Sequence, residues 1–293
     1  MTSPLTSSTR LVPSATLGCQ VLLREWSPPV ETIGDVLLIH GLGDHSGRHD
    51  WAARGLTRAG YRVTGFDWPG NGGSDGIRGD LPLVEAAGEL LDEVCGQLNL
   101  APLGIFAHST GAFLVVPWLA RKAGETAFAS SCRWVWFSSP LIRPSHRQPA
   151  LKIAFATHLA RYLPTMTLSS GVHARDCYHT SSRHAGESAF SRAGGHHRIS
   201  LRFAVSLLEF EAHVLDSVGS LPASIGYLLT QGAEDPVCPA KYAEDLFKGL
   251  PSPRKTFLLA ANSRHEPFRE PDPESFTNAV FNWLTNQGKG GSD

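Results

Sequence analysis

The sequence predicts an α/β fold in which helices flank a mostly parallel central sheet. The first observation is rhythm: from residue 18 onward, short β-rich apolar runs alternate with amphipathic stretches, as they do in parallel βα units. The second is that this rhythm stops after Ser139 and resumes near residue 220. The third is size, because 293 residues, 42% hydrophobic and 18% charged, suffice for one large domain or a core with an inserted subdomain.

The individual elements follow in chain order. Strands are expected at residues 19–26, 34–40, 61–67, 102–108 and 132–139, with helices at 51–60, 83–98 and 111–124. After the break, strands at 224–231 and 254–261 alternate with helices at 240–250 and 275–287. We therefore interpret 14–140 and 220–287 as two parts of one core, and 141–219 as an insertion. The two ends, 1–10 and 288–293, are expected to be flexible.

Composition and charge exclude several classes of function. The formal charge of -1 argues against nucleic acid as a partner. The five cysteines never form a CxxC motif, which favours reduced thiols in a cytoplasmic protein. We expect no export signal and no membrane anchor, because the amino terminus lacks an apolar run and no stretch approaches ~20 apolar residues. The histidine clusters lack the spacing of a zinc site, so no metal is expected.

The segment AHSTGA, residues 107–112, follows an expected strand and opens an expected helix. In this context a sharp turn lifts a serine hydroxyl out of the sheet, so Ser109 is the candidate nucleophile. The turn is crowded and needs small residues two positions away on either side. Gly111 meets this requirement, and Ala107 adds only one methyl group to the usual glycine.

A serine needs a base, and the base needs a group that orients it. Asp235 follows the strand expected at 224–231, and His265 follows the last expected strand. Because parallel strands end at the same edge of a sheet, both side chains should emerge beside Ser109. Glu234, next to Asp235, is the alternative acid, and Asp235 could instead cap the helix that follows.

An acyl-transfer site also needs donors for an oxyanion. The glycine-flanked segment HGLG comes directly after the strand expected at 34–40. Its Leu42 N–H could point at a substrate carbonyl together with the Thr110 N–H, because the glycines at 41 and 43 let the backbone approach closely.

Five motifs together resemble the monoglyceride lipase and lysophospholipase branch of the α/β-hydrolases. They are HGLGDHSGRHD, DWPGNGGSDGIRGD, AHSTGA, GAEDPV and RHEPF, and the resemblance extends from about residue 18 to 287. The chain departs from the family pattern by carrying Asp44 for Glu, His49 for Tyr, Asn71 for His, and Ala107 and Ala112 for Gly. The resemblance implies an α/β-hydrolase fold, a mainly helical cap formed by residues 141–219, and a lipid-like ester as substrate. It implies no cofactor.

The segment SLRFAVSLLEFEAHVLD, residues 200–216, has two apolar faces when drawn as one helix. Leu201, Ala204, Val205, Leu208, Ala212 and Leu215 share one face, and Phe203, Leu207, Phe210 and Val214 form the other. We expect the first face to pack inward. We therefore assign Phe203, Leu207 and Phe210 to substrate binding, in a channel for the acyl chain.

Three hypotheses of function follow. The first is a serine carboxylester hydrolase for esters with an apolar acyl chain, of monoacylglycerol or lysophospholipid type. The second is an amide or peptide hydrolase with the same triad. The third is a non-catalytic ligand receptor on the same scaffold, which predicts a damaged triad. Peripheral membrane contact through basic cap residues is a further expectation, with a solvated face as its alternative: Arg143, His146, Arg147, Lys152 and Arg161.

Overall fold

The computed structural model describes residues 7–98, 102–144, 149–179, 194–271 and 273–288. In these ranges the strands of the main sheet lie in the order β1-β2-β4-β3-β5-β6-β9-β10. Their bounds are β1 Ser7–Ser14, β2 Cys19–Trp26, β3 Gly34–Ile39, β4 Tyr61–Phe66, β5 Gly104–His108, β6 Trp134–Ser138, β9 Gly226–Gly232 and β10 Lys255–Ala260. The pairs from β4 to β10 are parallel, and β2 is antiparallel to both its neighbours. This confirms the predicted fold class.

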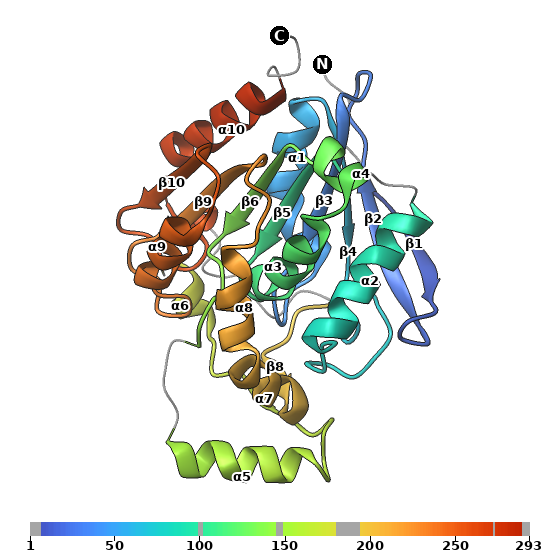
Figure 1. The fold of residues 1–293 in the computed structure, drawn as a ribbon, viewed down its shortest axis with the longest axis vertical. Helices are drawn as coiled ribbons and strands as arrows, with labels where there is room; N and C mark the ends of the chain where they lie inside the picture. Colours follow the sequence, from blue (N-terminus) through green and yellow to red (C-terminus); the bar gives the residue numbers. More distant parts are fainter. Residues whose placement is uncertain (1–6, 99–101, 145–148, 180–193, 272, 289–293) are drawn as a thin grey trace.

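Helices cover both faces of the sheet (Figure 1). The alternation of side chains along β3 shows why: Val36 and Leu38 point to one apolar core, and Leu37 and Ile39 point to the other. Helices α1 Asp50–Arg58 and α10 Glu274–Gly288 close the first core. Helices α2 Val84–Gln97, α3 Thr110–Lys122, α8 Glu211–Val218 and α9 Ala240–Gly249 close the second.

The chain between β6 and β9 covers the segment interpreted above as an insertion. It contains α5 Ala150–Ala160, β7 Thr167–Ser169, α6 Ala174–Cys177, β8 Arg198–Ser200, α7 Leu201–Glu209 and α8. The short strands β7 and β8 pair with each other and not with the main sheet. In Figure 1, α5 and α7 lie beyond the lower edge of the sheet, while α8 lies against α3. We refer to residues 149–179 and 194–209 as the cap.

Two expectations about individual elements were wrong. Residues 7–10, expected to be flexible, belong to β1, which pairs with β2 along its whole length. The strand is an exposed edge with only Val12 and Ser14 buried, so its sequence has little apolar periodicity. The helix expected across 200–216 breaks at Phe210, which ends α7 and precedes α8. Its two halves therefore do not share one helical wheel.

The remaining expected elements agree with the structure to within a few residues, and the sequence did not anticipate the short helix α4 Thr126–Ser131. Within the described ranges, no helix has both the length and the hydropathy required to cross a bilayer.

Candidate active site

Ser109 lies in a tight turn between β5 and α3. Its backbone has φ 52° and ψ -123°, a left-handed conformation that a non-glycine residue adopts only at an energetic cost. The turn is held by the Ser109 N–H, which donates to the Ser138 carbonyl at 3.0 Å. A Cβ at position 111 would lie 2.7 Å from the His40 carbonyl oxygen, so glycine is needed there. Ala107 is fully buried and fits between Ile39 and Phe137.

The structure brings Ser109, His265 and Asp235 together. The Ser109 hydroxyl lies 3.0 Å from Nε2 of His265, and Nδ1 of the same ring lies 2.7 Å from Oδ2 of Asp235. All three residues are buried. Because the carboxylate accepts the Nδ1 hydrogen, Nε2 is left as the acceptor for the serine proton.

Asp235 is held by several donors. Its Oδ1 accepts the backbone N–H groups of Val237 and Cys238 at 2.8 and 2.9 Å, and its Oδ2 accepts the Gln231 side-chain amide at 2.8 Å. Glu234, the alternative acid, is half exposed and pairs with His179 at 3.3 Å. The geometry therefore places Asp235, and not Glu234, against the imidazole.

Burial and charge act in opposite directions on His265. Burial lowers the pKa of its imidazole, but the Asp235 carboxylate more than offsets this and raises the pKa well above its ordinary value. Cys238 also lies beside the ring, and burial raises the pKa of its thiol, so it remains protonated at neutral pH.

Among the described residues, Asp235, Cys238 and His265 form the single cluster of potential metal ligands. Both nitrogens of His265 are already hydrogen-bonded within the triad.

Leu42 and Thr110, the expected oxyanion donors, border the same space as Ser109. Thr110 is the first residue of α3, so its N–H has no carbonyl partner within the helix. Gly41 lets the two loops approach, because a Cβ there would lie 2.9 Å from the Ser109 Cβ. Leu42 and Thr110 thus remain the candidate donors for an oxyanion formed at Ser109.

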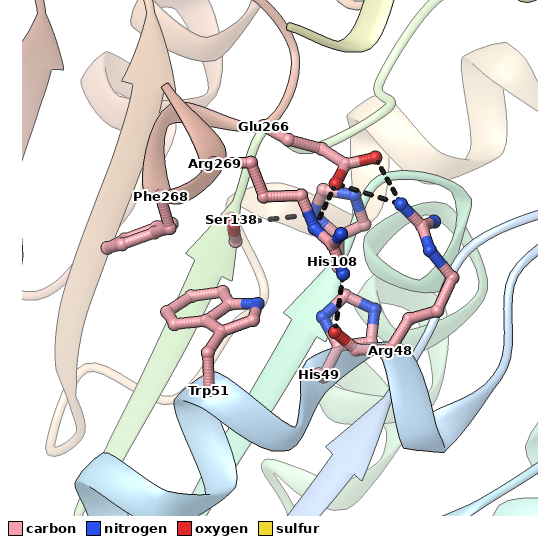
Figure 2. Close-up of a pocket in the computed structure, with 8 residues that line it drawn as sticks. All are labelled: Arg48, His49, Trp51, His108, Ser138, Glu266, Phe268 and Arg269. Carbon is pink, nitrogen blue, oxygen red and sulfur yellow. Dashed lines mark hydrogen bonds and ion pairs between the residues drawn. The ribbon is translucent and has the colours of Figure 1, made fainter. Parts of the chain in front are cut away.

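A buried network of charges surrounds Glu266, the residue after His265 (Figure 2). Both carboxylate oxygens of Glu266 accept hydrogen bonds from Nη2 of Arg48, at 2.8 and 2.9 Å. Glu266 also pairs with Arg269 at 2.8 Å. Arg48 also pairs with Asp44 at 3.0 Å, and so links the loop after β3 to the loop after β10. Burial raises the pKa of Glu266, but the two guanidinium groups lower it to about 2. Arg48 and Glu266 both lie within conspicuous sequence motifs, but no local pattern indicates that they pair.

Two departures from the family pattern contact each other in this network. Nε2 of His49 lies 2.8 Å from Oδ2 of Asp44, so the substituted ring pairs with the substituted carboxylate. The His49 ring also lies 5.1 Å from that of His108, which in turn lies 5.1 Å from that of His265 (centroid distances). His108 is fully buried; its burial and the charge of His265 hold its pKa well below the ordinary value, so it stays neutral.

Two cavities meet at Ser109. The larger, of about 410 Å³, extends under the cap and is lined mainly by apolar side chains: Leu42, Leu141, Ile153, Ala156, Leu168, Val172, Ile199, Leu201, Ala204, Val205, Leu207, Leu208, Val237 and Cys238. The smaller, of about 70 Å³, is lined by Asp44, Arg48 and Glu266 as well as by Ser109 and His265. A reacting group at Ser109 therefore has a large apolar space on one side and, on the other, a small space whose lining includes charged side chains.

The structure corrects the assignment of substrate-binding residues in the cap. Leu207 lines the larger cavity, but Phe203 is fully buried in the core and Phe210 packs against that core. The α7 face that was expected to pack inward, with Ala204 and Leu208, lines the cavity instead. The reason is the break at Phe210, which separates α7 from α8 and lets α8 pack on α3 by itself.

The fold and the Ser109–His265–Asp235 arrangement define a class, the α/β-hydrolases of the serine hydrolase type. Residues 31–272 match the sequence model of the family described as "Serine aminopeptidase, S33", and the chain belongs to this family. The resemblance to the α/β-hydrolases is thereby confirmed.

Several named proteins are similar over most of the chain. The human monoglyceride lipase is 26% identical over 90% of this chain and 85% of its own length. The crystal structure of a Paleococcus ferrophilus monoacylglycerol lipase superposes with a TM-score of 0.78 at 28% identity, covering 91% of this chain and 99% of that one. An uncharacterized abhydrolase domain-containing protein of Dictyostelium discoideum is 27% identical over 89% of this chain, which spans 27% of that protein's length.

Proposed function

We propose that the protein hydrolyses carboxylic esters with an apolar acyl chain, of monoacylglycerol or lysophospholipid type, through an acyl-enzyme on Ser109. One observation carries the proposal: the Ser109 hydroxyl, 3.0 Å from His265 Nε2, lies where an apolar cavity of about 410 Å³ meets a small cavity with charged side chains in its lining. The larger cavity suits an acyl chain and the smaller one suits a polar alcohol. The similarity to monoglyceride lipases supports the same reading.

The reaction follows from the positions of the side chains. Ser109 Oγ attacks the ester carbonyl while its proton passes to Nε2 of His265, and Asp235 stabilises the imidazolium. The carbonyl oxygen becomes an oxyanion that accepts the Leu42 and Thr110 N–H groups. Collapse breaks the ester bond, and the alcohol leaves with the proton from Nε2. Water then repeats the sequence on the acyl-enzyme and releases the carboxylic acid and free Ser109.

The family's description favours a peptidase as the second candidate. A carboxylate that carries no other ion pair would favour binding of a substrate's ammonium group. Among the described residues that line the two cavities, the carboxylates are those of Asp44 and Glu266, and both pair with Arg48. This supports an ester over a free amino terminus. The assembled triad supports an enzyme over a receptor.

The test is a matched panel of substrates. The same series of short, medium and long acyl groups is offered as glycerol esters and as amides, together with aminoacyl amides. We expect kcat/KM to rise with acyl length and to be higher for each ester than for its amide, with Ser109→Ala inactive. Faster cleavage of aminoacyl amides than of any ester would instead identify a peptidase.

The cap exposes apolar side chains that suit a lipid surface. Leu151 is 83% exposed and Phe155 66% exposed, both on α5, which projects from the body (Figure 1). Of the basic residues expected to meet a membrane, His146 and Arg147 lie outside the described residues, while Arg143 pairs with Glu211. Lys152 on α5 and Arg161 directly after it are exposed, so the proposed peripheral membrane contact rests on these two cations together with the apolar side chains.

Flotation with phosphatidylcholine vesicles tests this contact. The double variant Leu151→Ser, Phe155→Ser should float less than the wild type. Val30→Ser is the control, because Val30 is similarly exposed, at 64%, but lies outside the cap, between β2 and β3. Equal loss of flotation in both variants would contradict a role for α5.

A further inference from the structure

The loop that carries His265 also carries a charged side chain that the proposed mechanism does not use. We propose that Glu266 is a positioning residue that, by binding Arg48, fixes the backbone next to His265. The imidazole of His265 is thereby kept in line between Asp235 and Ser109. This inference rests on the proposed function, because it assigns to Glu266 the support of the catalytic base.

His265 lies in irregular backbone, so no helix or strand fixes its direction. Strand β10 ends at Ala260, and the next helical turn begins at Pro267. The peptide that precedes the imidazole is held by packing, because a Cβ at Gly232 would overlap the Arg264 carbonyl oxygen. The backbone on the other side of His265 depends on how the residue after it is held.

Glu266 is held through both its backbone and its side chain. Its N–H, which belongs to the peptide directly after His265, donates to the Cys177 carbonyl at 2.7 Å. Its two carboxylate oxygens accept from Nη2 of Arg48 at 2.8 and 2.9 Å (Figure 2). Arg269, which pairs with the same carboxylate, donates in turn to the Arg48 carbonyl at 3.0 Å. The loop is therefore tied to Arg48 by two routes.

Arg48 is a suitable anchor because it lies on a rigid element. It belongs to the helical turn Ser46–His49, directly before α1, and its side chain is 11% exposed. Its Nη1 pairs with Oδ1 of Asp44 at 3.0 Å, and Oδ2 of Asp44 lies 2.8 Å from Nε2 of His49. The guanidinium that meets Glu266 is thus already fixed by its own loop.

The bridge should matter for turnover more than for folding. Charge-assisted hydrogen bonds fix a geometry, whereas two apolar side chains of similar size would only fill the same space. Replacing a buried ion pair by such apolar side chains is often neutral for stability. A misplacement of about 1 Å at a reacting group can nevertheless cost ~100-fold in rate.

The experiment compares the double variant Arg48→Met, Glu266→Met with each single variant and with Glu266→Gln. Each single variant leaves a charge without one of its partners and should lower Tm. The double variant removes both charges and should regain most of this Tm, but without the hydrogen bonds. Glu266→Gln keeps one carbonyl oxygen that can accept from Arg48. The control is Asp35→Met, Arg62→Met, which removes an ion pair at the starts of β3 and β4, the ends away from Ser109.

The substrates are the methyl ester and the glycerol ester of one long-chain acid. Arg48 and Glu266 line the small cavity, so a role in contacting the leaving alcohol would affect the glycerol ester alone. A displaced imidazole slows both esters by the same factor, because His265 takes the serine proton whatever the alcohol. The readouts are kcat and KM for each ester, together with Tm.

We expect the double variant to lose kcat by about 10-fold to 100-fold on both esters, with KM changed less than about 3-fold and Tm close to that of the wild type. Glu266→Gln should recover most of the activity that Glu266→Met loses, and the control should keep the wild-type kcat. If the double variant does not fold, the comparison of Glu266→Gln with Glu266→Met on the two esters decides.

Four results would contradict the role of Glu266. They are recovery of kcat together with Tm in the double variant, a loss confined to the glycerol ester, equal loss of kcat in Glu266→Gln and Glu266→Met, and a control as slow as the double variant. Failure of the proposed function would be recognised separately, because the wild type would then show no Ser109-dependent ester hydrolysis at all.

Discussion

Two regions differ in how firmly their side chains are held: the cap, and the loops that follow β5, β9 and β10, here termed the strand ends. At the strand ends, Asp235 accepts three hydrogen bonds besides the one from the imidazole, and the residues of the triad are all buried. In the cap, α5 has no buried residue, and its Leu151 is 83% exposed. The strand ends therefore hold a preorganised set of side chains, whereas α5 leaves its side chains largely exposed.

The same difference predicts where substitutions should act. Changes at the strand ends should remove turnover for every substrate alike. Changes in the cap should alter the preference among substrates by smaller factors. A cap variant that lost all activity, or a strand-end variant that changed substrate preference alone, would contradict this division.

The largest effect is expected for the triad. His265→Ala should lower kcat about 10⁴-fold at little cost in Tm, because the ring is needed as base and acid but is not a structural centre. Glu234→Gln is the control, since Glu234 is half exposed and pairs with His179. Steady-state kinetics and thermal unfolding of both variants check this. Inactivation by Glu234→Gln with a fully active Asp235→Asn would transfer the role of acid to Glu234.

The pH dependence should be the next largest effect. Catalysis needs neutral His265, whose pKa is raised by Asp235, so kcat/KM should fall as pH drops through a pKa above about 6.5. Asp235→Asn removes the charge that raises this pKa, and burial alone lowers it. The acidic limb of the profile should therefore move to lower pH in the variant, at a much reduced maximum. An unmoved limb would show that another group controls it.

The tight turn should give an intermediate effect. Ala107 is fully buried between Ile39 and Phe137, so Ala107→Val should overfill the sheet and cost about 1–3 kcal/mol of stability. It should also lower kcat, because it displaces the Ser109 hydroxyl from His265. Ala107→Gly should stay within a few fold of wild type. Chemical denaturation and kinetics decide, and equal activity of the two variants would show that the turn has room to spare.

The smallest effect is expected in the cap, as a change of preference. Ala204 lines the larger cavity, so Ala204→Phe should shorten it and favour short esters over long ones. Each methylene that loses burial costs about 0.8 kcal/mol, which gives a shift of several fold in the ratio of kcat/KM values. Leu163→Phe is the control, because Leu163 is also in the cap but is 47% exposed and does not line the cavity. Equal shifts in both variants would contradict a channel at Ala204.

The sequence predicts the strand ends much better than the cap, for physical reasons. Buried parallel strands are continuous apolar runs, and their loops carry chemistry at fixed offsets, so the positions of Ser109, Asp235 and His265 could be inferred. The bridge from Arg48 to Glu266 joins two loops far apart in sequence, and no local pattern reports it.

In the cap, local pattern was misleading. The faces of α7 were assigned by extending one helical wheel across Phe210, where the helix in fact breaks. The apolar residues on both faces of α7 suit the core and the cavity equally well. Which face lines the cavity therefore depends on the direction that the chain takes after the break at Phe210. The placement of Phe203 in the core and of Ala204 in the cavity is a tertiary outcome.

The most direct test of the central claim is the mass of the protein during turnover. The wild type is mixed with a long-chain p-nitrophenyl ester, quenched in acid within the first turnover, digested and sequenced by mass spectrometry. The account predicts a transient acyl group on the peptide containing Ser109, formed with a stoichiometric burst of p-nitrophenol and absent from Ser109→Ala. An acyl group on any other residue, or turnover by Ser109→Ala at the wild-type rate, would contradict it.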